Sequence, residues 1–182
     1  MGDLLVEIKL EYRPLRVGTS RGRLLLSTDL KESLEIALEG RGLAPTTLSL
    51  EAPLLRDGEF AIPLQLHQAR ELNGLSLELT LPEELEYAGM EFPEGSLAGQ
   101  PLLLVDPGEE GRLGLGLSFG QPLSGGGLLG LLRLRLRSAS PSSLMLALTS
   151  AMVRSAAGVT DTLALPAPLD LGTGVAAKPT LA

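Results

Sequence analysis

Two strings in the chain fit the Gly-x-Ser-x-Gly pattern of a serine nucleophile, one from Gly18 to Gly22 and one from Gly116 to Gly120. A nucleophile elbow needs a strand before the serine, a helix after it, and a histidine base. Both strings are flanked by residues that alternate as strands do, and His67 is the one histidine in the sequence. No spacing places an acid beside His67, so we interpret it as a strand-end or loop residue and expect no serine catalysis.

Two carboxylate pairs, Glu83 with Glu84 and Glu109 with Glu110, have the residue type of a glycosidase acid and base. That chemistry needs two carboxyl groups that face each other about 5 to 10 Å apart. Both pairs lie in expected turns, where adjacent side chains point into water. The sequence therefore indicates solvated turn acids rather than a hydrolytic site.

The sequence contains no motif that indicates a cofactor site or a metal site. The glycines at 111, 114, 116 and 120 miss the Gly-x-Gly-x-x-Gly spacing of a dinucleotide loop, and no Asp-rich calcium loop is present. The sequence has no cysteine, which excludes thiolate ligands and disulfides. We expect a protein that is not an enzyme and that has no catalytic residue, cofactor or metal.

Charge and hydropathy exclude further classes of partner. The formal net charge is −7, which repels nucleic acid, and Arg133, Arg135 and Arg137 form the one basic stripe. Because these arginines alternate with leucines, we place them on the solvated face of one strand. No apolar stretch approaches the roughly 20 residues of a membrane span, and the sequence as given opens without the pattern of a secretory signal.

The elements behind these side chains are expected to be strands. Apolar residues recur at every second position in short runs separated by Gly, Pro, Asn or Asp, which predicts an all-β chain. The segment from Thr28 to Gly40 also fits a capped helix, but residues 34–39 alternate and we prefer a strand there. The clearest predicted strands are 4–10, 22–27, 60–66, 75–81, 101–105, 112–119, 131–137, 143–150 and 162–171.

A break near Gly40 to Pro45, with two glycines and a proline, predicts a domain boundary. We expect a small β domain over residues 1–43, a β-sandwich over 44–174 and a disordered tail over 175–182. The first part holds too few strands for an independent sandwich, whereas the second is long enough for one.

The larger segment resembles the cohesin module, a nine-stranded jelly-roll β-sandwich related to carbohydrate-binding modules. The resemblance rests on the order of its strands and turns: RDGEFAIPLQL (56–66), LTLPEELEYAGMEFPEG (79–95), RLGLGLSFG (112–120) and SGGGLLGLLRLRLR (124–137). It implies a non-catalytic module of an extracellular or cell-surface multidomain protein. It also implies that a flat sheet face made by the family's strands three, five, six and eight docks a protein partner, the dockerin.

Residues 1–43 resemble the C-terminal part of an immunoglobulin-like surface-protein repeat. The residues that carry this likeness are EYRPLRVGTSRGRLLLSTD and the closing LEIALEGRG. The likeness implies that the parent protein continues upstream.

Alternation selects the outward residues of the docking face. In the strand from Arg112, the leucines and Phe119 face the core, which leaves a low surface of glycine and serine outside. The alternatives are a polysaccharide-binding module, for which only Tyr12 and Tyr87 could stack on sugars, and a structural spacer. The candidate partner-binding residues are Ser76, Glu78, Thr80, Gly114, Gly116, Ser118, Ala147 and Thr149.

Overall fold

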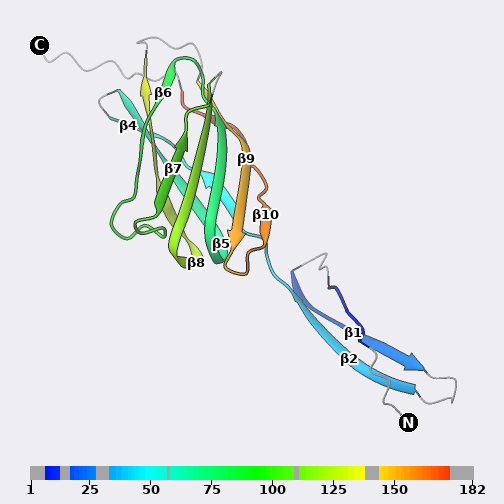
Figure 1. Ribbon diagram of the computed structural model, residues 1–182. Coiled ribbons are helices and arrows are strands. Elements are labelled where there is room, and N and C mark those ends of the chain that lie inside the picture. Colours follow the sequence, from blue (N-terminus) through cyan, green and yellow to red (C-terminus); the bar gives the residue numbers. More distant parts are fainter. Residues whose placement is uncertain are drawn as a thin grey trace, which may run out of the picture. The chain divides into compact units, whose positions relative to one another are not determined.

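A computed structural model describes residues 7–12, 17–27, 33–56, 58–108, 111–137 and 144–172. The chain forms two compact units, Met1–Pro45 and Thr46–Ala182. The described elements are all strands (Figure 1). The expected tail at 175–182, like Glu109 and Glu110, lies outside the described residues.

The smaller unit is a two-stranded antiparallel ribbon of β1 (Gly18–Ser27) and β2 (Ser33–Gly42). Opposite residues share a face, so the pairs Leu24 with Ile36 and Leu26 with Leu34 make one face apolar. The other face carries two cross-strand ion pairs, Arg21 with Glu39 and Arg23 with Glu35, each at 3.0 Å. The tyrosine ring of Tyr12 lies against Gly40 at one end of the apolar face.

Strand was the right interpretation of residues 34–39, because they pair with β1 along their whole length. Residues 28–32 of the alternative helix lie outside the described residues. The strand predicted over 4–10 is wrong for 7–10, which join no sheet; residues 4–6 are not described. Apolar and polar residues do alternate over 7–10, but this segment forms no backbone pairing with any described strand.

The larger unit confirms the expected all-β, nine-stranded architecture. Two of its strands are long, and each absorbs two of the predicted ones: 60–66 and 75–81 are both in β5, and 112–119 and 131–137 are both in β8. The strands are β3 (Thr47–Leu50), β4 (Leu54–Arg56), β5 (Glu59–Thr80), β6 (Leu85–Glu91), β7 (Leu102–Asp106), β8 (Arg112–Leu136), β9 (Met145–Ser155), β10 (Thr160–Thr162) and β11 (Leu169–Asp170).

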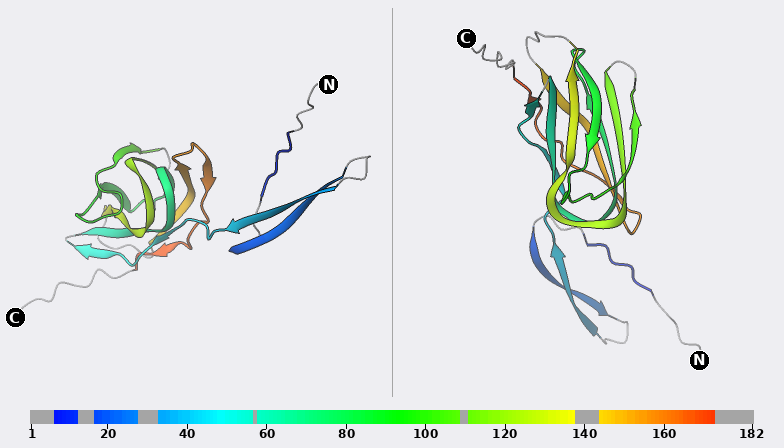
Figure 2. Two further views of the ribbon diagram at one scale, coloured as in Figure 1. Left: turned by 90° about the horizontal axis from the view of Figure 1, so that it is seen from below. Right: turned by 90° about the vertical axis from the view of Figure 1, so that its left-hand side faces the viewer.

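β5 and β8 pair with each other and run through both layers of the sandwich (Figures 1 and 2). In what we call the first sheet, residues 74–80 of β5 and 112–118 of β8 form the centre, and the strand order is β7-β8-β5-β9-β10. In the second sheet, residues 59–66 of β5 and 127–135 of β8 form the centre, with β3 and β4 beside β5 and β6 beside β8.

The passage of β5 from one sheet to the other is made by a series of register shifts between Leu64 and Gly74. Such bulges bend a strand and increase its twist. At this corner Gln68 and Glu71 have φ angles of 55° and 47°, the left-handed region that non-glycine residues rarely adopt. On the facing stretch of β8, Gly125 supplies a positive φ of 99° without that steric cost.

The core between the sheets is built mainly from leucine. Alternation puts every second residue of the long strands inside, including Ile62, Leu64 and Leu66 of β5, all fully buried. The prediction for β8 is confirmed, since Leu113, Leu115, Leu117 and Phe119 are buried. With few aromatic rings to fill the space, packing depends on many aliphatic contacts.

The arginine stripe of β8 lies on the outer face of the second sheet, as expected for one strand face. It is ion-paired there: Glu59 accepts hydrogen bonds from Arg133 and Arg135, and Glu86 lies 3.7 Å from Arg135 and Arg137. The Glu59 side chain is 17% exposed, and Arg135 and then Arg133 hold its pKa below its ordinary value. The stripe is therefore a charge-compensated surface rather than a site for polyanions.

The predicted strand over 162–171 is wrong in its middle, because only Thr160–Thr162 and Leu169–Asp170 pair with β9. Pro166 and Pro168 lack the N–H that a ladder needs, which explains the interruption. β3 and β4, which cover one edge of β5, are too short for the alternation to have singled them out.

Replacing Gln68 tests the bend in β5. Gln68→Val is expected to destabilise the fold by about 1–2 kcal/mol, because a β-branched residue fits the left-handed region poorly. Gln68→Gly is the matched control and is expected to be neutral or stabilising. Denaturant unfolding measures both; equal stability of the two variants would contradict strain at this corner.

Glu59→Gln tests the ion-paired face through its pH dependence. Because the folded pKa of Glu59 is lowered, the carboxylate stabilises the fold above its unfolded pKa near 4.5, and that stabilisation is lost as pH falls through the folded pKa. The variant should be less stable than the parent at pH 7, and the difference should shrink below pH 4.5. A difference that stays constant between pH 7 and pH 3, measured by thermal unfolding, would contradict this assignment.

Candidate functional site

The two Gly-x-Ser-x-Gly strings do not form nucleophile elbows. Ser20 lies inside β1 and Ser118 inside β8, and in each case the strand continues on both sides of the serine. No turn into a helix projects either hydroxyl toward a base. The context that the sequence analysis judged missing is absent at both strings.

His67 does have a serine partner, which the sequence did not indicate. The Ser49 hydroxyl is 3.0 Å from His67 Nε2 and donates to Glu51 Oε1 at 2.9 Å. In a catalytic triad the histidine stands between the acid and the serine, so that it can take the serine proton. Here the serine stands between the histidine and the acid, and its proton already points to Glu51. The group is a surface hydrogen-bond chain across β3 and β5.

The structure brings together no site for carboxylate-based hydrolysis or for metal binding among the described residues. Glu83 and Glu84 lie in the turn before β6, as expected. Within the described ranges, no group of three or more His, Asp or Glu side chains lies close enough to hold a metal ion.

Both tyrosines are engaged in packing. Tyr87 packs against the sandwich core, where burial raises the pKa of its phenol, and Tyr12 lies on Gly40 of the smaller unit. Sugar recognition by stacking needs an exposed ring face. Tyr12 is 48% exposed but belongs to the smaller unit, so the larger unit has no fully exposed tyrosine ring, which disfavours the polysaccharide-binding alternative.

The outer face of the first sheet is the most distinctive surface of the larger unit. Its register sets side chains in rows across the strands: Leu104, Gly116, Ser76 and Met152 form one row, and Leu102, Ser118, Gly74 and Arg154 form the next. Small residues therefore fall on the two central strands, and large ones fall on the strands at either side.

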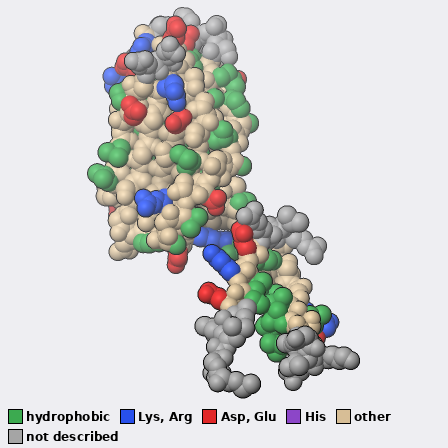
Figure 3. Space-filling view, turned by 45° about the vertical axis from the view of Figure 1, so that its right-hand side comes forward, with side chains coloured by type: hydrophobic (Ala, Val, Ile, Leu, Met, Phe, Trp, Pro, Cys, Tyr) green, Lys and Arg blue, Asp and Glu red, His purple; other side chains and the backbone are tan. Residues whose placement is uncertain are grey.

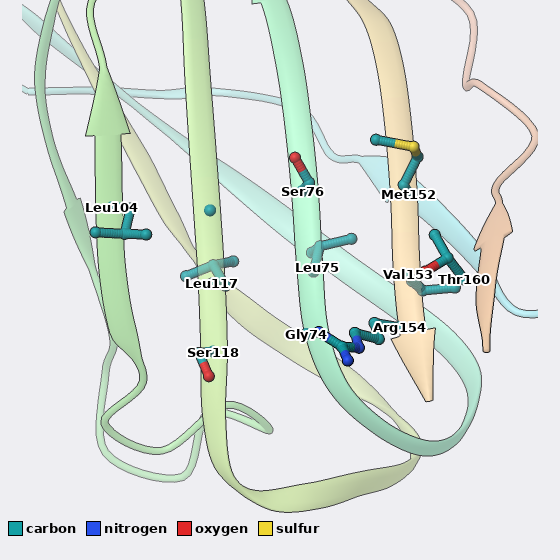
Figure 4. Close-up of a pocket in the computed structure, with 11 residues that line it drawn as sticks. Gly74, Leu75, Ser76, Leu104, Leu117, Ser118, Met152, Val153, Arg154 and Thr160 are labelled. Atoms are coloured by element: carbon teal, nitrogen blue, oxygen red, sulfur yellow. The ribbon is translucent and has the colours of Figure 1, made fainter. Parts of the chain in front are cut away.

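These rows form a shallow hollow of about 240 Å³ along β8 and β5, which we call the trough. Its side walls are Leu104 of β7, 67% exposed, and Met152 of β9, 40% exposed. Figure 4 shows both side chains standing on either side of Ser76 and Leu117. Leu104 lies beside Gly116, where an added Cβ would be 3.5 Å from Leu104 Cβ and 3.9 Å from its Cδ1.

The walls correct the expectation of a flat face. The trough floor is as low as the sequence predicted, since Gly116 and Ser76 bring the backbone close to the surface. The flanking leucine and methionine make it a groove with apolar sides.

Figure 3 shows hydrophobic side chains on the larger unit as separate patches, whereas on the smaller unit they gather into one group.

The eight candidate residues all lie on the outer face of the first sheet, but only Ser76, Gly116 and Ser118 line the trough. Glu78, Gly114 and Thr80 continue the same face beyond it, with Glu78 ion-paired to Arg112 at 3.2 Å. Ala147 and Thr149 lie on β9 at that same end, where the Thr149 hydroxyl donates to the Glu78 carbonyl.

Sequence reasoning missed Leu104, Met152 and Arg154. A bulge at Thr149 shifts the phase of β9, so that alternation counted from Leu144 fails beyond Leu148 and puts Met152 on the wrong face. Leu104 lies in a run of consecutive apolar residues, in which alternation has no contrast. A single sequence also does not indicate that the strand of Leu104 lies at the edge of the sheet.

No protein-family model and no curated protein matches the chain. Solved structures do. A non-cellulosomal cohesin from the archaeon Archaeoglobus fulgidus aligns with a TM-score of 0.53 and 22% identity, over 66% of this chain and 86% of that one. The chain has a cohesin-like fold.

Two further cohesins support the same assignment. The cohesin module of a Clostridium perfringens family 33 glycoside hydrolase aligns with a TM-score of 0.56 and 16% identity, over 69% of this chain and 93% of that chain. A cohesin from scaffoldin B of Acetivibrio cellulolyticus, solved in complex with a mutant Cel5 dockerin, aligns with a TM-score of 0.53 and 13% identity, over 66% and 94%. These similarities confirm the cohesin fold expected from strand order; they do not test the immunoglobulin-like part.

In the part of the chain that the structure describes, no helix is long and apolar enough to cross a membrane.

Gly116→Arg is expected to leave the fold intact. A Cβ at Gly116 meets Leu104 only at ordinary contact distance, so the free energy of unfolding should change by less than about 0.5 kcal/mol. The contrast is Gly130→Ala, whose Cβ would lie 3.0 Å from the Glu91 carbonyl oxygen and 3.1 Å from Met90 Cε. That overpacking should cost about 1–3 kcal/mol in denaturant unfolding. A Gly116→Arg variant as unstable as Gly130→Ala would show that the trough is not open.

Proposed function

We propose that the larger unit is a non-catalytic docking module that binds a helical, dockerin-like protein partner in the trough. The observation that carries the proposal is the trough itself: two exposed apolar walls on either side of a floor of glycine and serine. Exposed leucine and methionine beside a close-approach surface are features of protein interfaces.

The width of the trough favours a helix as its occupant. The wall strands β7 and β9 are three strand spacings apart, since β8 and β5 lie between them, which corresponds to about 14 Å. An α-helix with its side chains is about 10–12 Å across and fits between such walls. The low floor lets a helix approach until its side chains contact both Leu104 and Met152.

The cohesin-like fold supports the same proposal. One of the similar solved structures is itself a complex of a cohesin with a dockerin. The side chains of the trough point to a protein rather than a sugar, because its lining offers no aromatic ring. We propose that the module belongs to an extracellular multidomain protein, with the sandwich domain over 44–174.

We further propose that residues 1–43 are the C-terminal part of an immunoglobulin-like β domain. The support is the ribbon's division into an ion-paired face and an apolar face that includes Leu24, Ile36 and Leu34. An apolar face of this kind is half of a sandwich core, and a lone ribbon has little stability of its own.

Hydrogen exchange of the full chain tests the smaller unit. Amides of β1 and β2 should exchange much faster than those of β5 and β8, because among the described strands the ribbon has only two members. Equal protection of the two units would show that the ribbon is a self-sufficient domain.

A capture and titration experiment tests the docking function. The full chain serves as bait for the envelope and secreted fractions of the source organism, and a captured protein is then purified and titrated calorimetrically. Gly116→Arg should weaken its binding by more than about 100-fold, because the new side chain fills the trough at its centre. Ala88→Arg, at an exposed position of β6 in the second sheet, should leave the affinity within about twofold.

Two results would overturn the proposal. One is a partner whose affinity is unchanged by Gly116→Arg. The other is a partner that loses affinity equally with Ala88→Arg, since that result would place the interface elsewhere.

A further inference from the structure

Opposite charges lie at one end of the trough and just beyond its other end. At one end Arg154 of β9 lies beside Gly74, where a glycine Cβ would be 3.6 Å from Arg154 Cβ. Just beyond the other end, Asp106 of β7 lies beside Gly114, where a Cβ would be 3.3 Å from Asp106 Cβ and 3.9 Å from its Oδ2. Figure 4 shows the Arg154 side chain extending toward Gly74.

Neither charge is neutralised among the described residues, where no ion pair includes Arg154 or Asp106. Their neighbours nearly cancel one another. Beyond Asp106, Glu78 is ion-paired to Arg112. Beyond Arg154, the β5 corner carries both Arg70 and Glu71. Asp161 of β10 is in register with the buried Val153, and therefore belongs to the face opposite to that of Arg154. A net positive end and a net negative end therefore remain.

The separation of these ends matches a short helix. From Gly114 to Ser118 the floor strand β8 advances four residues, which corresponds to roughly 13 Å. An α-helix covers that distance in about nine residues. A helix of this length lying along the trough would have both of its termini beside the charged ends.

We propose that the trough binds its partner helix in one direction, with the helix N-terminus at Asp106 and the C-terminus at Arg154. This inference rests on the docking function proposed above. The first N–H groups of a helix have no partner within the helix and carry partial positive charge, which a carboxylate stabilises. The last carbonyl groups carry partial negative charge, and a guanidinium can donate hydrogen bonds to them.

The bound helix would thus run parallel to β8 and antiparallel to β5. The residues at its centre must be small or flexible enough to approach Gly116 and Ser76, and its flanks must be apolar to meet Leu104 and Met152. The partner chemistry that fits is an amphipathic helix of two to three turns that begins beside Asp106 and ends beside Arg154.

The probe is a phage-displayed library on a designed helical hairpin with one short helix randomised, selected on the full chain and counter-selected on Gly116→Arg. A photo-crosslinking residue then replaces Thr160, beside Arg154, or Thr80, beyond the acidic end. Crosslinks from position 160 should map to the C-terminal turn of the selected helices, and those from position 80 to the N-terminal turn. The double variant Asp106→Lys with Arg154→Glu should weaken these binders by about tenfold or more.

The outcomes separate the direction from the docking function. Selected binders that depend on Gly116 but crosslink in both directions, or in the reverse one, would overturn the direction and leave docking in place. Binders unaffected by the double charge reversal would also overturn it. A selection that yields no binder sensitive to Gly116→Arg would overturn the docking function, and the direction with it.

Discussion

The larger unit depends on two strands that belong to both of its sheets. β5 and β8 pair with each other through the whole height of the sandwich, and every other strand of that unit except β10 and β11 pairs directly with one of them. A bend in β5 therefore has to be matched by a bend in β8, and the strained φ angles at Gln68 and Glu71 lie at this point. Burial of the leucines on both sides of the bend offsets that strain.

The same constraint creates the candidate site. Because β8 has its core side chains at Leu113, Leu115 and Leu117, the residues between them must face outward, and two of these are glycines. The floor of the trough is thus the reverse side of the core strand. Its walls come from neighbours whose outward residues are large, Leu104 and Met152. The described side chains of this surface offer shape, apolar contact and charge at Arg154 and Asp106.

Much of this architecture was predictable, because strand alternation depends on local sequence alone. It identified the inward leucines of β8, the outward arginines and the low floor at Gly116. It failed where tertiary structure decides. The bulge at Thr149 reverses the face of Met152, and the run of apolar residues in β7 hides the outward position of Leu104. The hydrogen-bond chain of His67, Ser49 and Glu51 depends on the pairing between β3 and β5, which the spacing of these residues in the sequence does not indicate.

The central claim is that a protein partner occupies the trough of the first sheet, and the methyl groups of its walls are direct reporters of that contact. The decisive measurement is a methyl NMR spectrum of the leucine- and methionine-labelled chain, recorded with and without a purified binding partner. We predict large shifts for Leu104 and Met152, with Leu54 of β4 and Met90 of β6 unchanged in the second sheet. Shifts confined to Leu54 and Met90, or none at either wall on saturation with the partner, would contradict the account.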